Sequence, residues 1–134
     1  MLFDVTINTP QGLFRQTRAS IVNVVSTDGQ RGILPNHMPI VVSLAVGKMT
    51  MEEEGSRETY AISGGVLFFR NNQCTILTPA IENVRDIDLD RAERARERAE
   101  ERLRRLNDER VDMARAQAAL QRAINRINVR RDLR

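Results

Sequence analysis

The residues best placed to do chemistry are arginines that recur beside aspartates in the last third of the chain. Asp88, Arg91 and Arg98 follow one another at spacings of three and seven, which places them on nearly one face of a helix. Arg122 and Arg126 stand four residues apart, on one face of a second helix. Several guanidiniums beside one carboxylate could hold a polyphosphate, because each guanidinium presents paired donors to phosphate oxygens. The alternative is a solvated face of ordinary ion pairs.

Two other reactive residue types occur once each. His37 is the single histidine, and with one distant cysteine it cannot form a zinc site without several carboxylates. A catalytic base would also need an orienting partner, and none is evident. We therefore interpret His37 as a hydrogen-bonded loop residue and Cys74 as a small buried residue in a strand. Neither G-x-x-x-x-G-K-[ST] nor G-x-G-x-x-G occurs, so no nucleotide-binding loop is predicted. Because no nucleophile–base pair and no cluster of metal ligands is visible, we expect no catalytic residues and no metal site.

The elements that carry the arginines begin after Pro79. The last 55 residues contain no Gly, Pro, Phe, Trp or Tyr, so little interrupts a helix there. Asp86 or Asp88 can cap the first helix, and Asn107-Asp108 is the only turn signal before a second helix. The two apolar stripes at helical spacing are Leu89, Ala92, Ala95, Ala99, Leu103 and Leu106, then Met113, Ala116, Leu120, Ala123 and Ile127.

These stripes predict an antiparallel two-helix hairpin over residues 86–134. Its seam is mostly alanine, which buries little area at roughly 25 cal/mol per Å². We therefore expect a weakly held hairpin that opens when another surface offers more burial. A permanently docked hairpin is the alternative.

Residues 1–85 contain short runs rich in β-branched residues between turn signals. The predicted strands are residues 3–8, 21–25, 39–46, 59–63, 66–69 and 74–77. Gly47 is expected to end one of them, and Gly64-Gly65 indicates a bulge or a close backbone approach. Residues 32–39 contain two prolines and should form a rigid, non-helical connection. The predicted fold class is α+β, mainly β: an N-terminal antiparallel β-sandwich followed by a C-terminal antiparallel two-helix hairpin.

Charge is divided unevenly between these regions. Residues 1–85 hold 7 basic and 7 acidic residues, whereas residues 86–134 hold 14 arginines and 11 acids. An arginine-rich tail is typical of nucleic-acid binding. Here, however, acidic residues alternate with the arginines and leave no continuous positively charged surface for a phosphate backbone. We expect ion-paired helix surfaces and no nucleic-acid partner; a coiled-coil adaptor is a further alternative. No secretory signal and no membrane-spanning run are predicted.

Three motifs identify a resemblance over essentially the full length. The first is VTINTPQG at residues 5–12, and the second is GQRGILPNHMP at 29–39, which matches G-x-x-G-[IV]-x-P-x-H-x-P. The third is IDLDRA at 87–92, matching I-D-x-x-R-A, while GGV at 64–66 and RAINR at 122–126 also fit. In this order and spacing, the chain resembles the epsilon subunit family of the F-type rotary ATP synthase.

The resemblance implies a non-catalytic rotor subunit in proton-driven ATP synthesis. Residues 1–85 would bind the gamma subunit and the ring of c subunits, with Gln30 and Arg31 in a loop facing the ring and His37 facing gamma. Residues 86–134 would permit ATP hydrolysis when folded, and would block it when extended along gamma into the alpha–beta hexamer. The implied location is peripheral, at the cytoplasmic face of a bacterial membrane or, alternatively, the stromal face of a thylakoid.

The resemblance also implies a regulatory ligand. In several bacterial members the folded hairpin binds ATP, which stabilises that state by mass action and is not a substrate. No cofactor is obligatory, and a role for Mg²⁺ is left open. The positions that match the family's ATP site are Ile87, Asp88, Arg91, Ala92, Arg98, Arg122 and Arg126, with Glu82 nearby.

Overall fold

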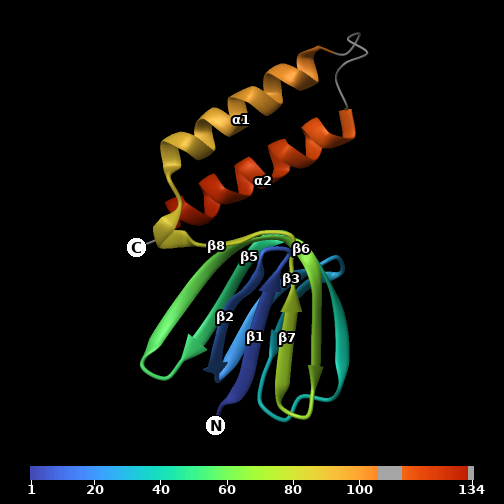
Figure 1. The fold of residues 1–134 in the computed structure, drawn as a ribbon, viewed down its shortest axis with the longest axis vertical. Coiled ribbons are helices and arrows are strands. Elements are labelled where there is room, and N and C mark those ends of the chain that lie inside the picture. The colour runs from blue at the N-terminus through green and yellow to red at the C-terminus, as the bar shows by residue number, and fades with distance from the viewer. Residues whose placement is uncertain (106–112, 133–134) are drawn as a thin grey trace. The chain divides into compact units, whose positions relative to one another are not determined.

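The computed structural model describes residues 1–105 and 113–132 and divides the chain into two compact units, Met1–Asn83 and Val84–Arg134. The first unit is built from strands and the second from two helices (Figure 1). The predicted fold class, a β-sandwich followed by two helices, is therefore confirmed.

The first unit contains eight strands within the described residues. They are β1 (Phe3–Thr9), β2 (Gly12–Ala19), β3 (Ile21–Ser26), β4 (Gly29–Ile33), β5 (Ile40–Glu53), β6 (Ser56–Arg70), β7 (Gln73–Leu77) and β8 (Ile81–Asn83). Their order is β2-β1-β7-β6-β5-β3-β4, and β8 pairs with β6. The second half of β6 pairs with β7 and its first half with β8, so this long strand contributes to both layers.

Alternating apolar residues of these strands form the core. Phe3, Val5 and Ile7 of β1 are buried, as the period of two predicts. Phe3 meets Phe69 of β6 edge-on, with ring centroids 5.3 Å apart. Strands that lie far apart in the sequence therefore contribute side chains to one core.

The structure corrects two predictions about the strands. Gly47 does not end β5, which continues to Glu53; a Cβ at Gly47 would lie 3.1 Å from Cβ of Val25, so this glycine serves close strand packing. The sandwich is also not wholly antiparallel, because β1 and β7 pair in parallel. Since five strands separate them in the sequence, this pairing needs no local crossover helix.

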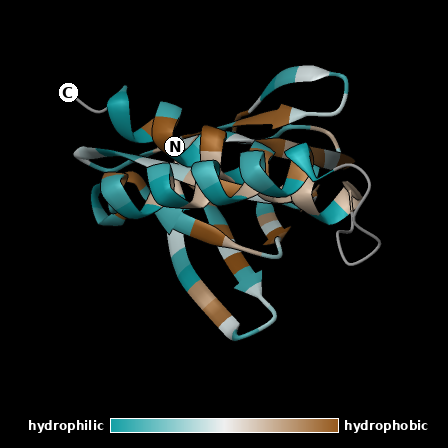
Figure 2. Cartoon of the chain, turned by 90° about the horizontal axis from the view of Figure 1, so that it is seen from above, coloured by the Kyte–Doolittle hydropathy of each residue, from teal (hydrophilic) through white to brown (hydrophobic). Residues whose placement is uncertain are grey.

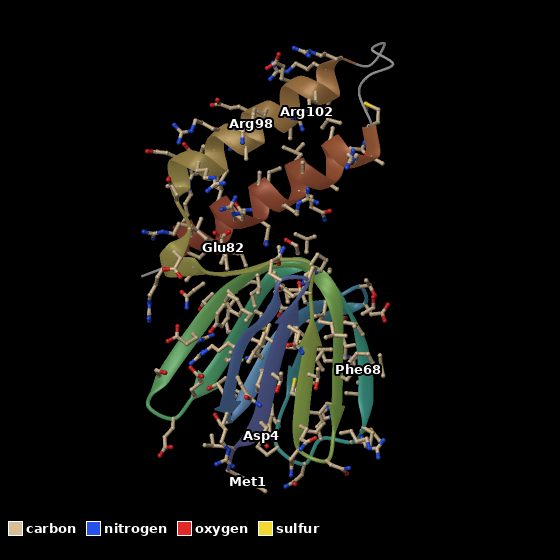
Figure 3. All side chains as sticks on the ribbon, in the orientation of Figure 1. Met1, Asp4, Phe68, Glu82, Arg98 and Arg102 are labelled. Carbon is tan, nitrogen blue, oxygen red and sulfur yellow. The ribbon has the colours of Figure 1, made fainter. Side chains whose placement is uncertain are left out.

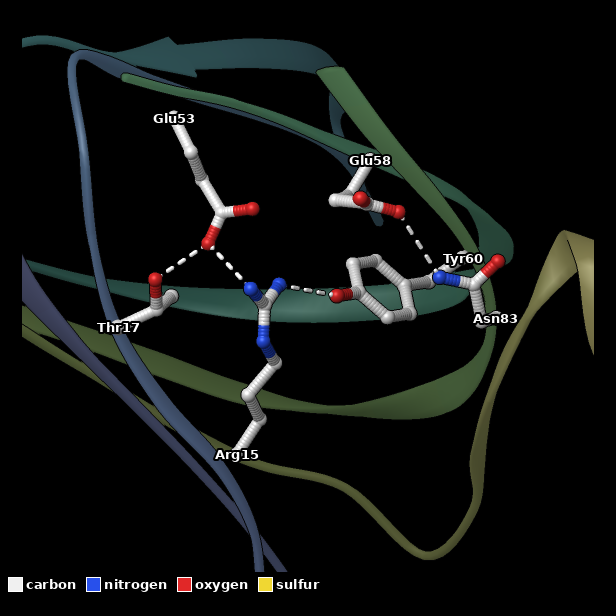
Figure 4. Close-up of polar contacts among 6 residues, drawn as sticks. All are labelled: Arg15, Thr17, Glu53, Glu58, Tyr60 and Asn83. Carbon is white, nitrogen blue, oxygen red and sulfur yellow. Dashed lines mark hydrogen bonds and ion pairs between the residues drawn. The ribbon is translucent and has the colours of Figure 1, made fainter. Parts of the chain in front are cut away.

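A polar network ties β2 to β5 and β6 (Figure 4). The Arg15 guanidinium donates to the Tyr60 hydroxyl at 2.6 Å and lies 2.7 Å from the Glu53 carboxylate, which also accepts a hydrogen bond from Thr17. Burial raises the pKa of Tyr60. Beside it, Asn83 of β8 donates to Glu58 at 3.0 Å, which fastens the last strand to β6.

Cys74 is buried in β7, as predicted. Burial raises the pKa of its thiol to about 12. We expect the folded chain to resist thiol reagents at pH 8, and the unfolded chain in denaturant, as the control, to react at the ordinary rate. Below the ordinary pKa of about 8.5 the thiol is protonated in both the folded and the unfolded chain, so the contribution of Cys74 to the free energy of unfolding is fully present. This contribution declines as the pH rises toward 12, because the thiol of the unfolded chain ionises first. Rapid labelling without denaturant would contradict this burial.

The second unit begins with the 3-10 helix η1 (Val84–Asp86) and continues with α1 (Leu89–Arg104) and α2 (Met113–Arg131). An ion pair of 2.6 Å joins Glu93, near the start of α1, to Arg131, at the end of α2. The two helices therefore run antiparallel, as predicted. Leu106, Asn107 and Asp108, including the predicted turn, lie outside the described residues.

The hairpin seam has the predicted composition. Ala92 and Ala99 of α1 are buried, as are Ala116, Ala123 and Ile127 of α2. The remaining surface of the helices is mainly hydrophilic (Figure 2). Across the described parts of the chain, none of the helices combines the length and the apolar character that crossing a bilayer requires.

Candidate functional site

The start of α1 is fixed by Asp88, which is the N-cap. Its backbone is extended, with φ −79° and ψ 107°, and its Oδ1 accepts a hydrogen bond from the backbone N–H of Arg91 at 3.1 Å. Asp86 lies in η1 instead. Of the two predicted caps the structure selects Asp88, so one of its carboxylate oxygens already orders the helix.

The arginines predicted to bind polyphosphate differ in exposure. Arg91, Arg98 and Arg122 are exposed, whereas Arg126 is half-buried. Arg98 and Arg102 lie one turn apart on α1 (Figure 3). Because α2 runs antiparallel to α1 and its end contacts η1, Arg122 and Arg126 belong to the half of the hairpin that contains the start of α1.

The remaining predicted ligand residues fall into two groups. Ile87 and Ala92 are buried in the second unit. Glu82 is half-buried in β8 of the first unit, where it stands opposite Ala61 of β6. The structure therefore brings Asp88 and Arg91 into contact and assigns Glu82 to a different unit from the arginines.

The capping role of Asp88 predicts a specific loss of stability. Asp88→Ala should lower the free energy of unfolding by about 1 kcal/mol, because the N–H of Arg91 loses its acceptor. Chemical denaturation followed by circular dichroism would measure it. Asp88→Asn is the matched control, since an asparagine caps equally well but carries no charge. Equal losses in both variants would show that the charge, and not the cap, is what matters.

Gln30 and Arg31 lie in strand β4 and not in a loop, which corrects the prediction from sequence. Gln30 stands opposite Val25 and Arg31 opposite Val24 of β3, directly after the two-residue turn Thr27-Asp28. Two glycines in four residues suggest a loop, but Gly29, at φ 125°, closes a hairpin and lets the next strand begin. Both side chains are exposed.

His37 is a hydrogen-bonded loop residue, as predicted. Its backbone N–H donates to the carbonyl of Leu34 at 3.1 Å, and its Nδ1 lies 2.7 Å from the carbonyl oxygen of Met38. The imidazole meets Phe69 edge-on, 5.9 Å between centroids. Residues 34–39 are non-helical, and Asn36 and Asn72 hold the connection through hydrogen bonds of 2.6 and 2.9 Å.

Large apolar side chains near this connection are exposed, and the sequence motifs did not single them out. They are Leu34, Met38, Val41 and Phe68, together with Met1 at the N-terminus. Val41 and Phe68 stand opposite each other in the β5–β6 pair (Figure 3 labels Phe68). Unbroken apolar runs at 40–42 and 67–69, in place of alternation, were the available signal.

Among residues 1–105 and 113–132, no three His, Cys, Asp or Glu side chains are grouped so that they could hold a metal ion.

Comparison with known proteins agrees with this architecture. Residues 2–84 match the family described as ATP synthase, Delta/Epsilon chain, beta-sandwich domain, and residues 85–130 match its long alpha-helix domain. The ATP synthase epsilon chain of Lactobacillus helveticus is 43% identical, over 96% of this chain and 92% of the relative. That of Halalkalibacterium halodurans is 40% identical, over 93% and 94%.

Solved structures of ATP synthases contain chains with the same fold. A chain in the Euglena gracilis mitochondrial ATP synthase structure of OSCP, F1 and c-ring superposes with a TM-score of 0.74 at 25% identity, covering 87% of this chain and 74% of that one. A chain of the Tetrahymena thermophila central stalk and c-ring shares the fold, with a TM-score of 0.62 and 13% identity over 96% and 92%. This chain belongs to the epsilon chain family of F-type ATP synthases.

Proposed function

We propose that this chain is a non-catalytic rotor subunit that joins gamma to the c ring during proton-driven ATP synthesis. The match of both units, in order and in one chain, to ATP synthase epsilon chains is the observation that carries this proposal. The chain acts by binding and by changing shape, and ATP hydrolysis and synthesis take place on other subunits.

The sandwich binds gamma and the c ring through different surfaces. The connection that holds His37 faces gamma, and the exposed Leu34 and Met38 beside it supply the apolar area that protein interfaces need. Gln30 and Arg31 face the ring. Together these contacts place the chain peripherally at the membrane, at the cytoplasmic face of a bacterial cell. The bacterial relatives favour this location over the thylakoid alternative.

The hairpin is a switch that inhibits ATP hydrolysis when it extends into the alpha–beta hexamer. Its folded state rests on small side chains, since Ala92 and Ala99 of α1 bury little area. Its cross-helix ion pair, Glu93–Arg131, is partly exposed and contributes at most about 1 kcal/mol. A competing surface or a ligand can therefore shift the hairpin's equilibrium with a modest difference in affinity.

ATP is the proposed ligand that holds the hairpin folded. The exposed guanidiniums of Arg91, Arg98 and Arg122, with Arg126, would bind its phosphates by charge-assisted hydrogen bonds. The carboxylate of Asp88 would contact other polar groups of the nucleotide. Because ATP binds one state and is not consumed, its concentration sets the folded fraction.

Reconstitution tests this proposal. The whole chain, or residues 1–85 alone, is added to an ATP synthase catalytic sector that lacks epsilon, and ATP hydrolysis is followed at several ATP concentrations. Inhibition by the whole chain only, relieved as ATP rises, is expected. A full-length Arg122→Ala/Arg126→Ala variant should bind the sector but lose both inhibition and ATP binding.

Two results would contradict the proposal in separable ways. Binding of the whole chain without inhibition would keep the rotor role and remove the switch. Failure to bind a closely matched sector would remove the rotor role as well.

A further inference from the structure

The outer face of β3, β4, β5 and β6 contains a polar hollow of about 350 Å³, and the proposed function assigns a role only to its residues Gln30 and Arg31. We call it the basic hollow and define it by Asn23, Gln30, Arg31, Lys48, Thr50 and Arg57, which line it. Strand register brings these residues together, because β3 pairs with both β4 and β5, and β5 pairs with β6.

The floor of the basic hollow is open and polar. Gly32 lets the Asn23 side chain lie close to the β4 backbone, because a Cβ at position 32 would lie only 3.0 Å from the Asn23 Oδ1. The Asn23 amide donates to the Thr50 hydroxyl at 3.3 Å, and Thr50 is buried in the sheet. A side chain at position 32 would crowd the Asn23 amide, so the glycine helps to keep this polar group in the lining of the hollow.

The rim of the basic hollow carries unneutralised positive charge. Arg31, Lys48 and Arg57 are exposed, and none of them has an ion-pair partner among the residues that the structure describes. Glu52 stands opposite Arg57 in register without forming an ion pair. By contrast, Arg15 and Arg18 of β2 are paired with Glu53 and Asp4.

We propose that the basic hollow binds an acidic, carboxylate-bearing segment of a neighbouring subunit of the synthase. The inference rests on the proposed function and deepens it, because Gln30 and Arg31, proposed to face the ring, form part of the rim. We infer an acidic partner from charge complementarity, because three cationic side chains line the hollow and only one carboxylate, that of Glu52, stands opposite one of them. Amides and a hydroxyl on the floor offer donors and acceptors that suit a polypeptide backbone as well as its side chains.

The charges should act mainly on the strength and salt dependence of association. A Lys48→Gln/Arg57→Gln chain should dissociate from the sector and ring about 3- to 10-fold more readily at low salt. The difference should shrink at 0.5 M salt, where the Debye length is only a few Å. Inhibition of hydrolysis per bound chain should not change, since neither residue lies in the hairpin.

Lys48 gives this proposal a direct chemical test, because it is the chain's only lysine. A carbodiimide joins an amine to a carboxylate with no spacer, so in the assembled synthase it reports groups in contact. We expect an amide bond between Lys48 and an Asp or Glu of a neighbouring subunit, located by peptide mass spectrometry. Lys48→Arg is the matched control, since it keeps the charge and the assembly but abolishes the cross-link.

The outcomes separate this inference from the function on which it rests. If the purified synthase contains the chain but Lys48 forms no cross-link to another subunit, the acidic partner is wrong while the rotor role stands. Sedimentation of the chain with phosphatidylglycerol vesicles, without a cross-link, would assign the basic hollow to lipid headgroups and overturn the proposal. Absence of the chain from the synthase would overturn both.

Discussion

Replacing Gly65 by alanine should remove most of the stability of the β-sandwich, because β6 has no room for a side chain there. A Cβ at this position would lie 2.1 Å from the carbonyl oxygen of Leu77 and 2.9 Å from Cα of Thr78. Both are backbone atoms of the neighbouring chain segment, so the clash cannot be relieved by rotating a side chain. The residue also has φ +117°, which adds strain for any other L-residue.

The expected loss for Gly65→Ala is above about 4 kcal/mol, which few single substitutions reach. Gly55→Ala is the matched control, because Gly55 has φ +79° but a Cβ there would meet nothing within 4 Å. It should lose only the conformational cost, about 1–2 kcal/mol. Urea unfolding of the two full-length variants measures both. Similar losses in the two variants would show that β6 and the Leu77 segment can separate without penalty.

Alternation of apolar and polar residues predicted the strands that send every second side chain into the core, such as β1. It did not predict the strands at the edges of the sheet. In β2 only Ala19 is buried, and its large apolar residues Leu13 and Phe14 are adjacent and exposed. In β4, two of five residues are glycine and only Ile33 is buried. The three-residue β8 is half-buried throughout. These strands are held by backbone pairing to neighbours, which a hydrophobic pattern does not record.

The candidate site likewise contains some features that the sequence predicts and others that it does not. The Asp88 cap was predictable because an N-cap acts within three residues, and the alanine seam because helical period is local. The basic hollow was not predictable, since Lys48 and Arg57 line the same surface only when two long strands pair in one register. The parallel β1–β7 pair likewise depends on closing the whole sandwich. Local sequence signals therefore predicted helices and strands, whereas the register of strand pairing determined which side chains share a surface.

Ala99→Leu should open the helical hairpin, because its seam is fitted to the smallest side chain. Ala99 is 1% exposed, and α2 is the main element that α1 contacts. A leucine there would force the helices apart at a typical cost of about 1–3 kcal/mol. At 1.4 kcal/mol per tenfold change, the open fraction should rise about 5- to 150-fold. The same substitution at Ala114, which is exposed on α2, should change little.

Hydrogen exchange and inhibition would then change together. In full-length Ala99→Leu, backbone amides of α1 should exchange faster by the same factor, because local opening limits their exchange. In the reconstituted sector the variant should inhibit hydrolysis more strongly and need more ATP to relieve it, since an open hairpin is available to extend. Faster exchange without stronger inhibition would separate hairpin opening from regulation. Slower exchange would mean that the seam holds unfilled space into which the leucine packs. The alanines of the seam would then no longer be a reason to expect a weakly held hairpin.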